Sequence, residues 1–425
     1  MKKINLYAII ITVLIITRCG QNNTDVEIVK TESGYQLHRF GEPYYIKGAG
    51  IEGHYDILKQ AGGNSIRTWG VDAWPEIFQM AEKYDLTVCA GIWLEQERQG
   101  FDYSDEAAVA DQFERIKQDI LEYKDHPQLL MWNVGNELDL DYTDPIVWNA
   151  VEQVAAFIKS IDKDHPVTTT TAFIEEEEVE LIQERCPSLD LLCINAYAGL
   201  PVVSQFLQDF GWDGPYIMGE WGTFGHWEVP KTEWGEPIEF TSKEKAELYQ
   251  QEYKEHILTE PNCLGAYVFF WGAKQERTPT WYGMFMADGA RTQAVDVMYH
   301  LWKGEWPADR APILDSLRID GLNAHMSITM AKKSMHTAKV WARDPENEDL
   351  RFRWEILHET QDKSTGGDEE QKPPQATIGT MTESGNELRF SAPQEPGPYR
   401  LFVYVYDPAG NGAHANIPFY VKKQD

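Results

Sequence analysis

Eight short apolar runs, separated by segments of helical periodicity, restrict the fold of this chain more than any other feature. The runs are Tyr44–Gly48, Ser65–Thr68, Thr87–Ile92, Leu129–Asn136, Val167–Thr171, Leu191–Ala196, Tyr216–Glu220 and Gly265–Trp271. The clearest helical segments are Asp105–Tyr123, Pro145–Ile161, Ser242–Leu258 and Gln293–Trp302. Apolar runs without polar alternation suit strands that are buried on both faces of a parallel sheet. Eight such strand–helix units predict an α/β fold, a (β/α)8 TIM barrel, over about residues 40–305.

Two of these runs end in a glutamate. Gly135 and Asn136 lead into Glu137 at the end of the fourth run, and Gly219 leads into Glu220 at the end of the seventh. Active sites of such barrels lie at the carboxyl ends of the strands, so the two carboxylates are expected to face each other across the mouth. Glycoside hydrolysis needs such a pair, one to protonate the leaving oxygen and one to attack or to activate water. The alternative is a strand that ends in a capped turn, where Asn and Glu are common.

The Asn-Glu end of the fourth strand, combined with the Gly-Glu end of the seventh, resembles the retaining glycoside hydrolases of the large (β/α)8 clan A. This resemblance covers residues 40–305. It implies that Glu137 is the acid/base and Glu220 the nucleophile, with carboxyl groups ~5–5.5 Å apart for a double displacement. The pKa of Glu137 is expected to be raised, because apolar walls and the Glu220 anion disfavour its charged form.

Four more residues match the pattern of the clan, which implies their roles. Arg67 and Tyr197, on the second and sixth strands, are expected to donate hydrogen bonds to Glu220. Asn136 is expected to bind the sugar 2-hydroxyl group. Trp271 is expected to lie beneath the sugar ring that is attacked and to pack against it. A buried arginine needs an acidic partner; the alternatives are a structural carboxylate for Arg67 and a core position for Tyr197.

Two long loops, residues 221–240 and 272–290, are predicted to form substrate walls, because loops of this length inside a compact domain usually carry function. The first loop carries Phe224, His226, Trp227 and Trp234, and the second carries Trp281, Tyr282, Met284 and Phe285. The further substrate-binding candidates are Trp93, Trp221, Trp227 and His54, with packing as the alternative for each.

The first 19 residues resemble a bacterial lipoprotein signal. Lys2 and Lys3 precede an apolar stretch over residues 4–16, which is short for a bilayer span, and Cys19 follows. The resemblance implies that Cys19 is lipidated, that the protein is exported to the bacterial outer membrane or cell surface, and that only this anchor contacts the membrane. Arg18 departs from the small residue that the signal prefers, and the alternative is an uncleaved signal anchor.

Composition narrows the partners. The net charge of −30 excludes nucleic acid, since binding a phosphate backbone needs a basic surface. Neutral sugars are indifferent to that charge. There is no Cys-x-x-Cys and no Cys/His cluster with zinc spacing, so neither a metal nor a cofactor is expected. A disulfide between Cys186 and Cys193 is left open, and nothing in the sequence requires more than a monomer.

The sequence pattern of residues 308–425 differs from that of the barrel and predicts a small immunoglobulin-like β-sandwich. Short alternating segments, such as Tyr399–Tyr406, lie between turn signals rich in Asp, Gly, Asn and Pro. The segment resembles the polycystic-kidney-disease or fibronectin modules of secreted glycan-degrading enzymes. A spacer or brace is the expected role, and carbohydrate binding is the alternative. The expected domains are a signal (1–19), a barrel with an N-terminal hairpin (20–307) and the sandwich (308–425).

The amino-acid sequence of the first two strands, Ile46–Gly50 and Asn64–Gly70, is similar to that of family 2 barrels. The whole layout of signal, barrel and immunoglobulin-like tail most resembles family 158 of the glycoside hydrolases. That resemblance implies a retaining endo-β-1,3-glucanase acting on laminarin-type β-glucan polysaccharide and oligosaccharides. The alternatives are another clan A activity (a β-mannanase, exo-β-glycosidase or transglycosylase) and a non-catalytic glycan-binding surface lipoprotein.

Overall fold

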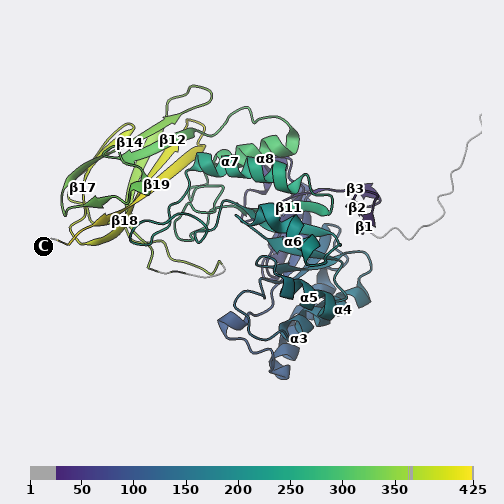
Figure 1. The fold of residues 1–425 in the computed structure, drawn as a ribbon. Coiled ribbons are helices and arrows are strands. Elements are labelled where there is room, and N and C mark those ends of the chain that lie inside the picture. Colours follow the sequence, from purple (N-terminus) through teal and green to yellow (C-terminus); the bar gives the residue numbers. More distant parts are fainter. Residues whose placement is uncertain (1–24, 362, 364–366, 424–425) are drawn as a thin grey trace, which may run out of the picture.

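The computed structural model describes residues 25–361, 363 and 367–423, and its larger part is a closed parallel barrel (Figure 1). In spatial order, starting from the seventh strand, the barrel strands are β10 (Tyr216–Gly222), β11 (Cys263–Trp271), β4 (Ile46–Ile51), β5 (Ser65–Arg67), β6 (Thr87–Ile92), β7 (Leu129–Asn136), β8 (Val167–Thr171) and β9 (Leu191–Asn195). Every neighbouring pair is parallel. The predicted TIM barrel is confirmed, and Glu137 and Glu220 fall at the ends of its fourth and seventh strands.

The helices between the strands form the outer layer. They are α1 (Tyr55–Gln60), α2 (Trp74–Tyr84), α3 (Glu106–Tyr123), α4 (Val147–Ile161), α5 (Glu176–Arg185), α6 (Val203–Asp209), α7 (Ser242–Glu252) and α8 (Gln293–Lys303). Asp105 caps α3 by accepting the N–H groups of the first turn, and Thr241 with Glu244 forms a capping box at α7. These caps satisfy the backbone donors that a helix start leaves open.

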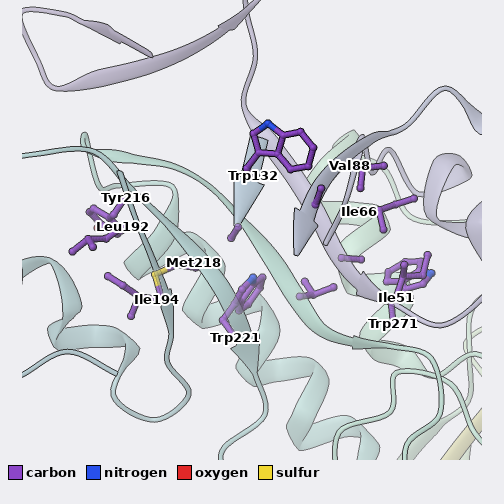
Figure 2. Close-up of a cluster of buried hydrophobic side chains, with 14 of the residues drawn as sticks. Ile51, Ile66, Val88, Trp132, Leu192, Ile194, Tyr216, Met218, Trp221 and Trp271 are labelled. Atoms are coloured by element: carbon purple, nitrogen blue, oxygen red, sulfur yellow. The ribbon is translucent and has the colours of Figure 1, made fainter. Parts of the chain in front are cut away.

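Period-two alternation along the strands divides the apolar side chains into two cores. Leu192 and Ile194 point out toward the helices, in the layer that Figure 2 shows together with Trp132. Leu191 and Cys193 point into the barrel, where their cluster is closed from below by a hairpin. That hairpin consists of β1 (Val26–Lys30), β2 (Tyr35–Arg39) and the short β3 (Glu42–Pro43).

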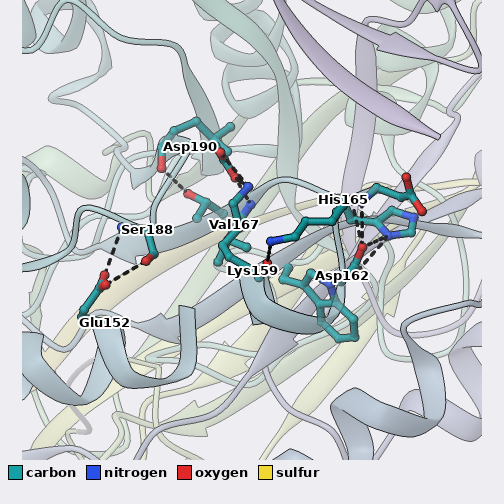
Figure 3. A network of polar contacts seen from close by, with 12 residues as sticks. Glu152, Lys159, Asp162, His165, Val167, Ser188 and Asp190 are labelled. Carbon is teal, nitrogen blue, oxygen red and sulfur yellow. Dashed lines mark hydrogen bonds and ion pairs between the residues drawn. The ribbon is translucent and has the colours of Figure 1, made fainter. Parts of the chain in front are cut away.

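A polar network ties the amino-terminal ends of the strands together (Figure 3). The Asp190 carboxylate accepts hydrogen bonds from the Val167 N–H at 2.8 Å and from Lys159 Nζ at 2.7 Å. Asp162 accepts from Trp132 Nε1 at 2.8 Å and lies 3.0 Å from His165 Nδ1. Charged groups at this end of a barrel serve stability, which leaves the opposite end for chemistry.

The C-terminal part is a β-sandwich of two four-stranded sheets, as predicted. One sheet has the order β12 (Ile313–Ile319), β14 (Met335–Arg343), β17 (Glu387–Ser391), β16 (Met381–Ser384). The other has the order β13 (Thr329–Met330), β19 (Gly412–Val421), β18 (Gly397–Tyr406), β15 (Arg351–His358). Their facing sides share one apolar core.

The sandwich docks directly on the barrel, beside α7 and α8 in Figure 1. The apolar part of the contact consists of Met286, Ala290, Leu357, Phe402, Tyr404 and Tyr406. The polar part centres on the buried Glu239, which accepts from Lys245 Nζ and Asn416 Nδ2, each at 2.6 Å. Burial alone raises the pKa of Glu239, but the charges of Lys245 and His414 and the hydrogen bonds from Lys245 and Thr278 outweigh that effect and hold the pKa at about 2. Burial lowers the pKa of Lys245, and Glu239 opposes that effect. The contact therefore contains a buried ion pair, with 2.6 Å between Lys245 Nζ and Glu239 Oε1.

Replacing Glu239 with Gln is expected to lower the free energy of unfolding by about 3 kcal/mol, because Lys245 is left buried without a counter-charge. Asp315→Ala is the control, since Asp315 pairs with Lys243 at the surface, where such pairs contribute about 1 kcal/mol or less. Urea titration followed by tryptophan fluorescence measures both. Equal losses in the two variants would contradict the assignment of a buried pair.

Several sequence features can be placed against the described residues. Cys89, Cys186, Cys193 and Cys263 are buried and free, so Cys186 and Cys193 do not pair. Cys19 and the predicted signal lie outside the described residues. Within the described part, no helix is both long and apolar enough to cross a membrane. Among the same residues, no group of His, Cys, Asp and Glu side chains is arranged to hold a metal ion.

Candidate active site

A pocket opens at the carboxyl ends of the barrel strands and encloses a cavity of about 320 Å³. Its lining residues are Trp69, Trp93, Asn136, Glu137, Tyr197, Glu220, Trp227, Phe269, Phe270, Lys274, Glu276, Tyr282, Gly367 and Asp368. Aromatic rings and carboxylates thus make up most of the wall. Such a surface suits sugar rings, which offer apolar faces and hydroxyl edges.

Glu220 is held by three donors from two strand ends, Arg67 and Trp69 from the end of β5 and Tyr197 from the end of β9. Its Oε1 accepts from Arg67 Nη1 and from Trp69 Nε1, each at 2.7 Å, and its Oε2 accepts from Tyr197 Oη at 2.8 Å. Arg67 is completely buried and also donates from Nη2 to Asn136 Oδ1 at 2.6 Å. The carboxylate is therefore fixed in orientation before any substrate arrives.

Glu137 stands one residue beyond β7, where the strand turns sharply. Gly135 and Glu137 both have positive φ, 78° and 51°, and a Cβ on Gly135 would meet the Leu138 side chain at 2.5 Å. Asn195 Nδ2 donates to Glu137 Oε1 at 2.7 Å. Burial, and next the negative charge of Glu220, raise the pKa of Glu137 to about 8. At neutral pH this carboxyl group carries a proton that it can donate.

Asn136 has its amide oxygen occupied by Arg67 and therefore has N–H donors left for a ligand. It lines the pocket beside Glu137. A sugar hydroxyl that lies between Asn136 and Glu220 would meet a donor on one side and an acceptor on the other. This arrangement can orient a sugar ring over the Glu220 carboxylate.

Eight sequence candidates come together at this place. Arg67 holds Glu220 from inside the barrel, and the pocket is lined by Asn136, Glu137, Tyr197, Glu220, Trp93, Trp227 and Tyr282. Trp227 is 56% exposed, which is unusual for a tryptophan and places it at the rim. Exposed aromatic rims of this kind can stack on a sugar.

Three candidates are corrected, because Trp221, Trp271 and His54 do not line the pocket. Trp221 follows the inward-facing Glu220, so alternation turns it outward onto Tyr249 and Tyr253. The pairing of β11 with β4 is irregular between Val268 and Trp271, and the completely buried Trp271 stacks on Trp302 of α8. His54 precedes α1 and stacks on Phe285, with 3.9 Å between ring centroids.

The place expected for Trp271 is instead taken by Phe269 and Phe270, two residues and one residue before it in the eighth strand. Trp69 was also missed, although it lies two residues after Arg67 and so falls on the same face of the chain. Asn195, which contacts Glu137, precedes Tyr197 by the same spacing. Both signals were present in the period-two pattern of strand ends. Gly367 and Asp368 come from the sandwich, and no sequence pattern indicated them.

The protonation of Glu137 sets an expected pH profile. If Glu137 must donate a proton, kcat/KM is expected to fall about tenfold per pH unit above about pH 8, because the carboxyl group loses that proton as pH rises through its pKa. A pH–rate profile between pH 5 and 10 measures this. A rate that stays constant up to pH 10 would contradict the acid role.

An eight-stranded parallel barrel whose pocket holds carboxylates from the ends of its fourth and seventh strands is the architecture of a glycoside hydrolase. Residues 46–294, more than half of the chain, match the family described as "Glycosyl hydrolases family 2, TIM barrel domain". The chain belongs to this family. The amino-acid sequence of its first two strands had indicated family 2. Membership of family 158 stays a prediction.

Curated relatives include β-glucuronidases. The pig enzyme (Sus scrofa) is 24% identical over 255 residues, covering 50% of this chain and 35% of that enzyme. The human enzyme (Homo sapiens) is 24% identical over 189 residues, covering 40% of this chain and 27% of that enzyme. This chain therefore spans about a third of the length of these relatives.

Among solved structures, the FMN-binding β-glucuronidase from Facaelibacterium prausnitzii L2-6 matches with a TM-score of 0.51 and 14% identity. The match covers 94% of this chain and 59% of that one. At this identity the likeness shows the shared fold alone.

Proposed function

We propose that this protein is a retaining β-glycoside hydrolase that cleaves β-1,3-glucan within the chain, with Glu137 as acid/base and Glu220 as nucleophile. The observation that carries this proposal is the contrast between two carboxyl groups in one pocket. Burial and the charge of Glu220 keep Glu137 protonated, while three donors orient Glu220. One group is thus equipped to give a proton and the other to attack.

In the first step, Glu220 attacks the anomeric carbon while Glu137 gives its proton to the glycosidic oxygen. The bond between that carbon and that oxygen breaks, and an ester to Glu220 forms. Oε2 is the oxygen better placed to attack, because it accepts one hydrogen bond whereas Oε1 accepts two. The aglycone leaves as an alcohol.

In the second step, Glu137 takes a proton from water, whose oxygen attacks the anomeric carbon and displaces Glu220. Esterification has meanwhile removed the negative charge of Glu220, which is the second cause of the raised pKa of Glu137. The pKa of Glu137 therefore falls when the residue must act as a base. Two inversions leave the product with the configuration of the substrate.

The charges of the pocket favour a neutral sugar. Its lysine, Lys274, is paired with Glu276 at 2.6 Å, and Asp368 adds a further carboxylate. A β-glucuronide is the second candidate substrate, which the names of the pig and human relatives favour. Lys274 already donates to Glu276 and to the Gly367 carbonyl oxygen, so one N–H remains for a uronate carboxylate, beside the negative charges of Glu276 and Asp368.

The β-1,3 linkage, the endo action and the location rest on the resemblance of the whole layout to family 158. In this proposal the protein is an exported lipoprotein, anchored through Cys19 at the bacterial outer membrane or cell surface. It acts there as a monomer on β-glucan polysaccharide and oligosaccharides.

A reducing-sugar assay on laminarin, mixed-linkage β-glucan, mannan, xylan and an aryl β-glucuronide tests the proposal. Strongest activity on laminarin with a ladder of oligosaccharide products is expected. Release of monosaccharide alone would indicate an exo-enzyme, and activity restricted to mannan or the glucuronide would replace the proposed substrate. Binding of oligosaccharides without any turnover would indicate a glycan-binding protein.

A further inference from the structure

The C-terminal sandwich reaches into the barrel pocket. The connection between β15 and β16 brings Gly367 and Asp368 to the wall of the pocket that also contains Glu137 and Glu220. A spacer or a brace needs no contact with that cavity. The position of these two residues therefore indicates a role in the site itself.

Asp368 is fixed by side chains that follow the third barrel strand. Arg98 forms two parallel hydrogen bonds with it, Nη1 to Oδ2 at 2.9 Å and Nη2 to Oδ1 at 3.1 Å, and Gln99 Nε2 donates to Oδ1 at 3.0 Å. Bidentate pairs of this kind fix the plane of a carboxylate. The Arg98 side chain is only 8% exposed.

The loop after the eighth strand holds the same segment from another direction. Lys274 Nζ donates to the Gly367 carbonyl oxygen at 3.0 Å, and the Arg277 N–H donates to the buried Glu370 carboxylate at 2.6 Å. Gly367 has φ +76°, and a Cβ there would lie 3.0 Å from Lys274 Nζ. Two barrel loops thus hold residues 367–370 in position, so that this part of the pocket wall is formed before substrate binds.

The Asp368 carboxylate keeps capacity for a ligand. Oδ1 accepts two hydrogen bonds and Oδ2 accepts one, while the side chain remains 42% exposed. An ionised carboxylate can accept about four hydrogen bonds and donates none. It therefore suits a sugar hydroxyl and repels a sugar carboxylate.

We propose that Asp368 is a substrate-binding residue, supplied by the sandwich, that accepts a hydrogen bond from a hydroxyl group of the bound glycan. This inference rests on the proposed function insofar as a neutral sugar occupies the pocket. The sandwich is then a determinant of substrate choice, and it disfavours uronate-bearing sugars through the charge of Asp368.

Asp368→Ala is expected to raise KM for laminari-oligosaccharides about tenfold, the scale of one hydrogen bond to a charged group, with kcat within about twofold. Asp368→Asn keeps one acceptor oxygen and is expected to recover part of the loss. Glu387→Ala, which removes a sandwich carboxylate paired with Lys339, is the matched control and should leave both constants unchanged.

The outcomes separate this inference from the proposed function. A lower thermal midpoint with an unchanged KM in Asp368→Ala would overturn the binding role and leave a brace. If the wild type cleaves a different neutral glycan, the KM comparison on that glycan decides, and the inference survives the failure of the laminarin proposal. If the wild type prefers a glucuronide and Asp368→Ala lowers its KM, both fail. Without any turnover, dissociation constants for laminari-oligosaccharides from calorimetry replace KM.

Discussion

Glu220→Gln is expected to lower kcat on laminarin by about 10⁴-fold or more, while the dissociation constant for laminari-oligosaccharides changes little. The amide keeps the shape and, at Oε1, an acceptor for Arg67 and Trp69, while its NH2 group faces Tyr197 Oη, whose oxygen can accept a hydrogen bond. It is a poor nucleophile toward an anomeric carbon. A loss of 10⁴ corresponds to about 5.5 kcal/mol in the activation free energy. Stopped assays give kcat, and calorimetry gives the dissociation constant.

Glu255→Gln is the control for this variant, because Glu255 is an exposed glutamate that does not line the pocket. It should keep the activity of the wild type. Glu220→Gly with added azide extends the test, since azide can occupy the vacated space and attack from the same face. An α-glycosyl azide product is expected from an activated aryl glycoside. Turnover by Glu220→Gln above about 1% of the wild type would contradict the assignment of the nucleophile.

Glu137→Ala is expected to produce a loss that depends on the leaving group. On laminarin, whose leaving alkoxide needs a proton, kcat/KM should fall about 10³-fold, within the usual contribution of general acid catalysis. On an activated aryl β-glycoside, whose phenolate leaves without a proton, formation of the ester should stay within about tenfold of the wild type. Pre-steady-state release of the phenol measures that step separately.

Two further observations accompany the loss in Glu137→Ala. The decline of kcat/KM above about pH 8 should disappear, because the group that titrates there is gone. Azide should restore turnover of the aryl glycoside and yield a β-glycosyl azide, because the azide anion, unlike water, can attack the ester without a general base. Equal losses on laminarin and on the aryl glycoside would refute the acid/base role.

Sequence patterns were sufficient for the barrel because its strands are buried on both faces, and such runs are visible without structural knowledge. The run Leu129–Asn136 coincides with β7, and Glu220 lies within β10. The partners of Glu220 could be anticipated as well, since Arg67 and Tyr197 stand at ends of strands that must meet at one rim.

The sequence was less informative where a regular pattern breaks or where distant segments meet. The irregular pairing of β11 turned Trp271 toward the helices and gave its expected place to Phe269 and Phe270. Asp368 lies far from Glu137 in the sequence and belongs to another domain, and only the docked sandwich brings it to the pocket. Neither the irregular strand pairing nor the docking of the sandwich produces a local sequence pattern from which it could be predicted.

The guanidinium group of Arg67 joins Glu220 and Asn136, and all three residues belong to barrel strands rather than to loops. The barrel strands therefore fix the position of Glu220, and Glu137 follows directly after β7, whereas Trp227 and Asp368 lie on connections between secondary-structure elements. Evolution or an engineer can consequently exchange those connections to admit another glycan without retuning the chemistry of bond cleavage. Substrate specificity and the rate of bond cleavage can thus change independently of each other in this protein.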